Sequence, residues 1–264
     1  KNDIDAIAIA VAGVVDTGSS SSSENNNNSS SVIFAGAGAV IVDIVDSEVL
    51  AQVAAGSAIG TTGALVVNAE DNSDVVADSG GLAFAVSTGQ SEGGTTSGSV
   101  GASVADNDVT QTIRATVTDT PITAASVDMD ASNNASIDTL TIAGSGSFSN
   151  SSQALAGAGA GSGNYIVATT EASIINPSGT QTVNASGGAV SVNALDNSRV
   201  NADAGSGAVA VTTASGGDSN NIGAVAIGAS VAVNHITKTT TARIDQADVQ
   251  SAAFTVEAAS TFIS

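Results

Sequence analysis

Apolar and polar residues alternate with a period of two along most of the chain. Clear runs are Ser191-Val192-Asn193-Ala194, Ala208-Val209-Ala210-Val211 and Ala224-Val225-Ala226-Ile227. Successive side chains of a β-strand point to opposite faces, so this pattern predicts short strands that bury Val and Ile on one face and place Ala, Ser or Asn on the other. Gly, Asn, Asp and Ser between the runs predict turns. The expected fold class is therefore all-β.

One motif recurs along the chain at nearly constant intervals. A polar residue followed by Ala marks it at positions 68, 130, 193 and 257, which gives spacings of 62, 63 and 64. A second anchor, Ala-x-Val or Ala-x-Ile, begins at positions 51, 115, 172 and 242. The chain therefore divides into four copies, about 1–71, 72–132, 133–196 and 197–260, and 261–264 opens a fifth.

Repeats of strands and turns predict a parallel β-solenoid, in which each coil buries its apolar face against its neighbours. A right-handed β-helix with roughly 20 residues per coil would make each copy about three coils and the chain a rod on the order of 60 Å long. An antiparallel β-sandwich or barrel is the alternative, and its hairpins would favour Asn-Gly or Asp-Gly turns. Neither dipeptide occurs. We therefore expect one continuous solenoid over 1–264.

Polar segments at one phase of the copies predict solvated loops. They lie at 17–31, 88–98, 144–152 and 213–221. Insertions at one phase map to one edge of a solenoid, where they are either tolerated loops or a contact ridge. Asn72, Asn134 and Asn197 fall at the turn between copies. Because Asn adopts left-handed backbone angles and bonds its own backbone in turns, a structural turn role is predicted for these three residues.

Composition and charge exclude several classes of protein. The chain carries 25 acidic and 5 basic residues, a net charge of −20, so nucleic-acid binding has no electrostatic basis. The absence of Cys excludes disulfide scaffolds and thiol chemistry. No apolar run approaches the roughly 20 residues of a membrane helix, so no membrane span is expected. Only 2% of residues are aromatic, which fits a narrow interior filled by Val, Ile and Ala.

The candidate chemical sites are weak, and no catalytic, cofactor or metal residue is predicted. Oxygen ligands alternate along the segment Asp128-Met129-Asp130-Ala131-Ser132-Asn133, so calcium binding remains an alternative. The segment lacks the Gly and Glu of an EF-hand loop. His235 is the only His, and we expect it at a turn or strand edge. The string Gly89-Gln90-Ser91-Glu92-Gly93 lacks the helix of a nucleophile elbow, because a polar loop follows it. The five basic residues are scattered, and no acids cluster around any of them. The chain is therefore expected not to be an enzyme.

The last copy resembles a known repeat. Its sequence is Gly-Ala-Val-Ala-Ile-Gly-Ala-Ser-Val-Ala-Val-Asn-His-Ile-Thr-Lys-Thr-Thr-Thr-Ala-Arg-Ile-Asp-Gln-Ala-Asp-Val over 223–249, followed by Phe-Thr-Val-Glu-Ala over 254–258. This segment is similar to repeats of very large secreted bacterial surface proteins, the filamentous-haemagglutinin-like and autotransporter adhesins. The first three copies match in part, and 88–110 match poorly. The resemblance implies a β-solenoid shaft, a location outside the cell or on the bacterial surface, and adhesion or filament building. It carries no catalytic or ligand residues.

The functional expectation is a structural shaft that displays Gly/Ser/Asn-rich loops. The pattern enters mid-strand at 3–9 and leaves in 261–264. We therefore expect further copies of the repeat or neighbouring subunits end to end, with glycans or other cell surfaces as further candidate partners. A carbohydrate- or surface-binding solenoid module is the alternative function. A polysaccharide-processing β-helix enzyme is the third.

Overall fold

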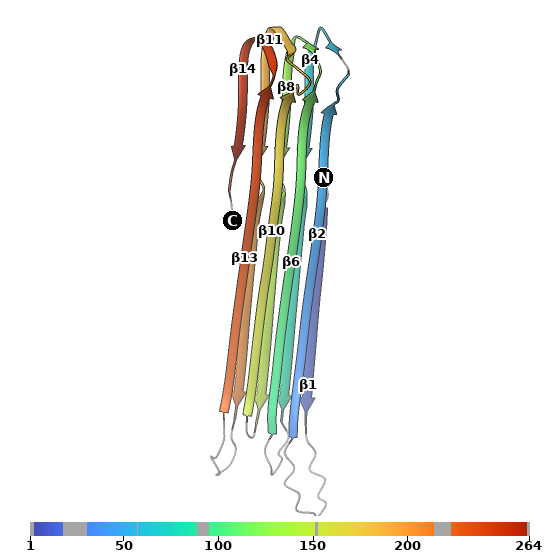
Figure 1. The fold of residues 1–264 in the computed structure, drawn as a ribbon. Helices are drawn as coiled ribbons and strands as arrows, with labels where there is room; N and C mark the ends of the chain where they lie inside the picture. Colours follow the sequence, from blue (N-terminus) through green and yellow to red (C-terminus); the bar gives the residue numbers. More distant parts are fainter. Residues whose placement is uncertain are drawn as a thin grey trace, which may run out of the picture.

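The computed structural model describes residues 3–17, 31–56, 58–88, 95–150, 153–213 and 223–262, and these form β-strands joined by short connections (Figure 1). The first coil holds β1 (Asp3–Asp16), β2 (Ser31–Val53), β3 (Ile59–Gly60) and β4 (Ala64–Asp71). The second holds β5 (Asp74–Ser87), β6 (Thr95–Thr118), β7 (Ile122–Thr123) and β8 (Ser126–Asn133). The third holds β9 (Ser136–Ser149), β10 (Gln153–Ile175) and β11 (Gln181–Asp196). The fourth holds β12 (Arg199–Thr212), β13 (Gly223–Asp245) and β14 (Ala247–Ser260).

Each coil is a long, flattened loop. Strands β2, β6, β10 and β13 run its full length, and each has 23 or 24 residues, or about 75 Å at about 3.3 Å per residue. The chain then turns at the upper end in Figure 1 and descends on the opposite side. Two strands follow one another on the descending side. For example, β4 ends one coil and β5 begins the next, with only two residues between them.

The coils stack through three parallel sheets. Sheet A has the order β1-β5-β9-β12, and sheet B has the order β13-β10-β6-β2. Sheet C has the order β3-β7-β11-β8-β4, and β14 also pairs with β11. Every strand pairing in the described part of the chain is parallel. The predicted all-β parallel solenoid is confirmed, and the antiparallel alternative is wrong.

The expectation of three coils per copy is wrong, because each copy contributes a single coil. Asp74, for example, pairs with Asp3 in one neighbour and with Ser136 in the other. Four coils at about 4.8 Å rise only about 14 Å along the stack, so the longest dimension of this segment follows the strands and not the stacking axis. Gly, Ser and Asn sit inside strands here, where neighbouring coils bond the backbone on both sides. The predicted rod of stacked coils is therefore replaced by a slab.

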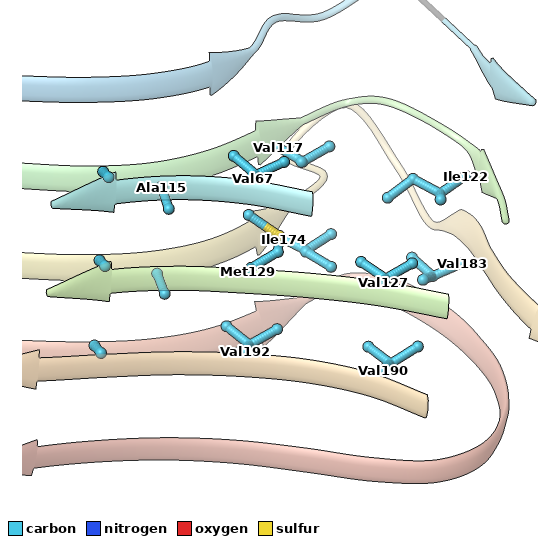
Figure 2. Close-up of a cluster of buried hydrophobic side chains, with 14 of the residues drawn as sticks. Val67, Ala115, Val117, Ile122, Val127, Met129, Ile174, Val183, Val190 and Val192 are labelled. Carbon is cyan, nitrogen blue, oxygen red and sulfur yellow. The ribbon is translucent and has the colours of Figure 1, made fainter. Parts of the chain in front are cut away.

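The interior near the upper turns is a hydrophobic core between sheet C and the upper part of sheet B. Ile113, Met129, Ile174 and Val192 are all 0% exposed there. Figure 2 shows Met129, Ile174 and Val192 between the strands, together with Val67 and Val117 of the same core. Val and Ile face inward in this half of the molecule, as the alternation predicts.

The lower half, between sheets A and B, has the opposite arrangement. Ala and Ser line the interior, while Ile9, Val40 and Val209 point outward and are 72%, 66% and 62% exposed. The two sheets approach so closely that a Cβ added to Gly101 would lie 2.1 Å from the carbonyl oxygen of Gly144. The prediction that Val and Ile are buried is correct for the part of this half next to the upper core, where Val75, Val109 and Ile137 are 0 or 1% exposed. It is wrong farther down, because the space between the sheets there admits only small side chains.

Two of the predicted loops are partly strand. Residues 95–98 belong to β6 and 144–149 belong to β9. Ser97 and Ser147 of these segments are buried and face one another, with their hydroxyl oxygens 2.7 Å apart. Small polar residues here fill the narrow interior and do not form loops. Residues 18–30, 89–94, 151–152 and 214–222 lie outside the described part, and the strands on either side of them end at the lower end in Figure 1.

Candidate interaction surface

A buried carboxylate layer separates the two halves of the interior. Asp71, Asn133 and Asp196 stand at equivalent positions at the ends of β4, β8 and β11. Each side chain accepts a hydrogen bond from the backbone N–H two residues later, at 3.0, 3.1 and 2.9 Å respectively. These bonds satisfy the backbone where the descending chain leaves sheet C for sheet A.

Sheet B supplies hydrogen-bond donors to Asp71 and a cation to Asp196. Ser47 Oγ and Gln111 Nε2 donate to Asp71 Oδ2 at 2.8 and 2.9 Å. Lys238 Nζ lies 3.2 Å from Asp196 Oδ1, and the two side chains are 1% and 0% exposed. The ammonium group also donates to the carbonyl oxygens of Ser198 and Thr261. A buried ion pair needs such additional hydrogen bonds to offset the cost of removing both charges from water.

A second polar layer is a ladder of amides within sheet B, buried at Asn107 and Asn164 and exposed at Asn234. Asn107 Nδ2 donates to Asn164 Oδ1 at 2.7 Å, and Asn164 Nδ2 donates to Asn234 Oδ1 at 3.0 Å. The donors therefore point from the second coil toward the fourth. Asp43 occupies the same position in β2, and burial raises the pKa of its carboxyl group. Asp43 Oδ2 and Asn107 Oδ1 have no hydrogen-bond partner among the described residues.

The three predicted turn residues form a third ladder, at the surface. Asn134 Nδ2 donates to Asn72 Oδ1 at 3.0 Å, and Asn197 Nδ2 donates to Asn134 Oδ1 at 3.2 Å. All three lie in the two-residue breaks between descending strands. Their expected left-handed backbone is not observed, because Asp119 and Gln246 are the non-glycine residues with positive φ in the described part. The stacked coils place the amides within bonding distance of one another, and that contact is visible only in three dimensions.

The outer faces of sheets A and B are apolar over much of the lower half. Ile7, Val11, Val42 and Ile44 of the first coil are each 60% or more exposed. On sheet B a shallow groove crosses the strands, and its lining is almost wholly apolar. Its lining includes Phe34, Gly98, Val100, Leu155, Gly157 and Ile227. Exposed apolar patches of this kind mark interaction surfaces in soluble proteins.

The residues that mark the repeat form a polar groove on the outer face of sheet C. Asn68, Asp130, Asn193 and Glu257 stand side by side in consecutive coils, and Asn193 Nδ2 donates to Asp130 Oδ1 at 2.9 Å. Burial, with the Asp130 carboxylate beside it, raises the pKa of Asp128. The structure brings Asp128 and Asp130 to one face, but Met129 and Asn133 point inward. No group of three or more His, Cys, Asp or Glu residues suited to a metal occurs among the described residues.

The basic residues are less scattered than the sequence indicates. Arg114 and Arg243 both pair with Glu171 on the outer face of sheet B, at 3.6 and 3.1 Å. A signal for this contact was present, because Arg114 and Glu171 each directly precede the Ala of the second anchor. His235 is exposed, and its ring centroid lies 6.2 Å from that of Tyr165. Gly89, Ser91 and Gly93 of the Gly-x-Ser-x-Gly string lie outside the described residues.

Comparison with known proteins leaves the function to be inferred from these contacts. No protein-family model, no curated protein and no solved structure matches the chain. No helix in the described ranges is long and apolar enough to cross a membrane.

Proposed function

We propose that this chain is a structural segment of an extracellular β-solenoid, part of the shaft of a bacterial adhesin or filament. The supporting observation is the continuous parallel register, in which the full-length strands β2, β6, β10 and β13 pair across all four coils. Each neighbouring pair of these strands is joined along the whole of the shorter strand, so adjacent coils cannot separate without breaking a long row of backbone hydrogen bonds. Such a body suits a load-bearing role.

The buried polar layers support the same role. A row of backbone hydrogen bonds alone permits slippage along the strands, since the side-chain period is only two residues. The amide ladder through Asn164 and the ion pair of Lys238 with Asp196 each have one register in which they are satisfied. A shift of one coil past another would leave these buried groups unpaired, at a cost of about 1–3 kcal/mol for each neutral group. The polar layers therefore hold the coils in register.

Localisation in the source organism tests this proposal. Antibodies raised against the purified 264-residue chain should label the surface of intact cells, with the label on material that projects from the envelope in immunoelectron microscopy. An antiserum against an abundant cytosolic protein provides the control for cell integrity. Label that appears only after the cells are permeabilised would contradict an extracellular shaft.

The apolar outer faces favour a second candidate, a surface-binding module. Val32, Phe34 and Val40 are 74%, 62% and 66% exposed on one face of sheet B. If this face binds surfaces, the chain should adsorb to alkyl-coated beads, and Val40→Ser should weaken adsorption without changing the unfolding midpoint. Chitin and cellulose particles test for glycan binding in the same assay. Equal adsorption of the variant and the parent chain would remove Val40 from any such role.

A further inference from the structure

We propose that the fourth-coil edge of one chain docks on the first-coil edge of a second copy, continuing the internal register. The contact would place β12, β13 and β14 beside β1, β2 and β4 of the other copy. This inference deepens the proposed function, because it names the partner and the register of a shaft that lengthens non-covalently. It rests on the match between the two outermost edges of the stack.

In sheets A and B the edge strands match in length and in register, whereas in sheet C β14 has 14 residues and β4 has 8. β12 and β1 each have 14 residues, and β13 and β2 each have 23. Following the pairs from β2 through β6 and β10 to β13 makes Asp43 equivalent to Asn234 and Leu50 equivalent to Thr241. A second copy placed one coil spacing beyond β13 therefore meets it with no overhang, at about 4.8 Å between strands.

The amide ladder of sheet B has a donor-to-acceptor direction that fits this contact. Its donors point toward the fourth coil, where Asn234 accepts a bond from Asn164. The next position in the row would be Asp43 of the second copy. A carboxylate accepts hydrogen bonds and does not donate when ionised, so it suits the Nδ2 group of Asn234. Within one chain, β2 has Asp43 and not Asn at this position. An ionised carboxylate cannot donate, so Asn107 Oδ1 receives no hydrogen bond from β2.

The first and fourth coils, at the two ends of the stack, also differ in net charge. Residues 1–71 contain nine acidic and one basic residue, whereas 197–260 contain five acidic and three basic residues. Arg199 of β12 and Asp3 of β1 occupy equivalent positions, so docking would set them side by side. The net charges are −8 for 1–71 and −2 for 197–260, so the fourth coil repels the first coil of a second copy less than another first coil would.

Side chains at the fourth-coil edge are left partly uncovered. Phe254 and Val256 continue the rows of Val190 and Val192, which are fully buried, yet they are 55% and 38% exposed. Leu65 and Val67 of a second copy would continue these rows and cover them. On the outer face of sheet A, Ile9 and Val11 would lie beside Gly205 and Gly207, so that large and small residues alternate across the contact.

Disulfide trapping tests the register directly, since the chain has no Cys. A Leu50→Cys chain is mixed with a Thr241→Cys chain under mild oxidation. Opposed Cα atoms at about 4.8 Å lie within the usual disulfide range of about 4.4–6.8 Å. The matched control is Glu48→Cys with Thr241→Cys, which is displaced by two residues. We expect at least tenfold more cross-linked dimer in the first mixture. Equal yields, or a predominance of Leu50→Cys homodimers, would overturn the register.

Substitution of the amide tests its role in the contact. Asn234→Asp keeps an acceptor for Asn164 but sets a carboxylate against Asp43 of the second copy. We expect sedimentation velocity at pH 7 to show at least tenfold weaker self-association, and Asp43→Asn in the same chain to restore it. Unchanged association of Asn234→Asp, or a parent chain that stays monomeric at every concentration, would overturn the docking. A stable folded monomer would contradict the docking but not the proposed structural role of the chain. Failure of the docking can therefore be distinguished from failure of the proposed function.

Discussion

The close approach of sheets A and B predicts a large penalty for one added methyl group. Gly101 of β6 faces the interior, and a Cβ there would lie 2.1 Å from Gly144 O and 2.8 Å from Gly81 O. Ordinary contacts to a Cβ begin near 3.4 Å, so the opposing backbone would have to move away before the methyl group could fit. The obstacles are backbone atoms, which cannot rotate away as a side chain can. Gly101→Ala is therefore expected to lower the free energy of unfolding by about 3 kcal/mol, the upper part of the range for overpacked cores.

Gly38→Ala in β2 is the matched control, because a Cβ there meets nothing within 4 Å. Replacing Gly by Ala also reduces the entropy of the unfolded chain, which stabilises by about 0.4–1 kcal/mol where the site is open. The control should therefore be neutral or slightly stabilising. Guanidinium unfolding followed by far-UV circular dichroism gives the midpoint of each variant. Equal midpoints for Gly101→Ala and Gly38→Ala would refute the close packing of the lower half.

Three further perturbations follow from the buried layers. Val192→Asp should cost several kcal/mol by burying an unpaired charge, whereas Leu195→Asp, on the outer face of the same strand beside Ser132 and Ala259, should cost much less in the same unfolding assay. Lys238→Met should cost about 3–5 kcal/mol, because it leaves the Asp196 carboxylate buried without its cation, and adding Asp196→Asn should recover much of the loss in urea titrations. Burial raises the folded-state pKa of Asp43, so its ionised form opposes folding and stability is lost as the pH rises through that value. Asp43→Asn should therefore raise the melting temperature more at pH 7 than at pH 3, and an equal shift at both values would contradict this assignment.

The sequence predicts the fold class because its evidence is local and repeated. Alternation with a period of two indicates strands, and a nearly constant copy length indicates a stack of equivalent units. The anchors at 68, 130, 193 and 257 do stand side by side in sheet C, since equivalent positions of a solenoid pair with each other. These inferences need no knowledge of which segment lies across the interior.

The tertiary structure alone decides how many coils a copy makes and which face of each strand is buried. Alternation defines two faces, but the distance to the opposite sheet determines whether Val or Ala fits between them. Near Val192 the sheets leave room for branched side chains. At Gly101 the opposing backbone excludes even a Cβ, so the small residues turn inward and the large ones face solvent. A row of small residues at alternate positions, 97 to 107 in β6 opposite 139 to 149 in β9, was the available sign.

The side-chain hydrogen bonds between coils, in the surface ladder as well as in the buried layers, also could not be predicted from the sequence. Asn134 and Asn197 belong to different copies, and a single side chain gives no indication of what stacks on it. The turn role assigned to them from intrinsic Asn preferences concerned the local backbone, whereas the contact they make is between coils. Local preference is a property of a residue and its neighbours in sequence. The register between two coils depends on the lengths of all the strands and turns between them. It is therefore fixed only when the whole coil has folded.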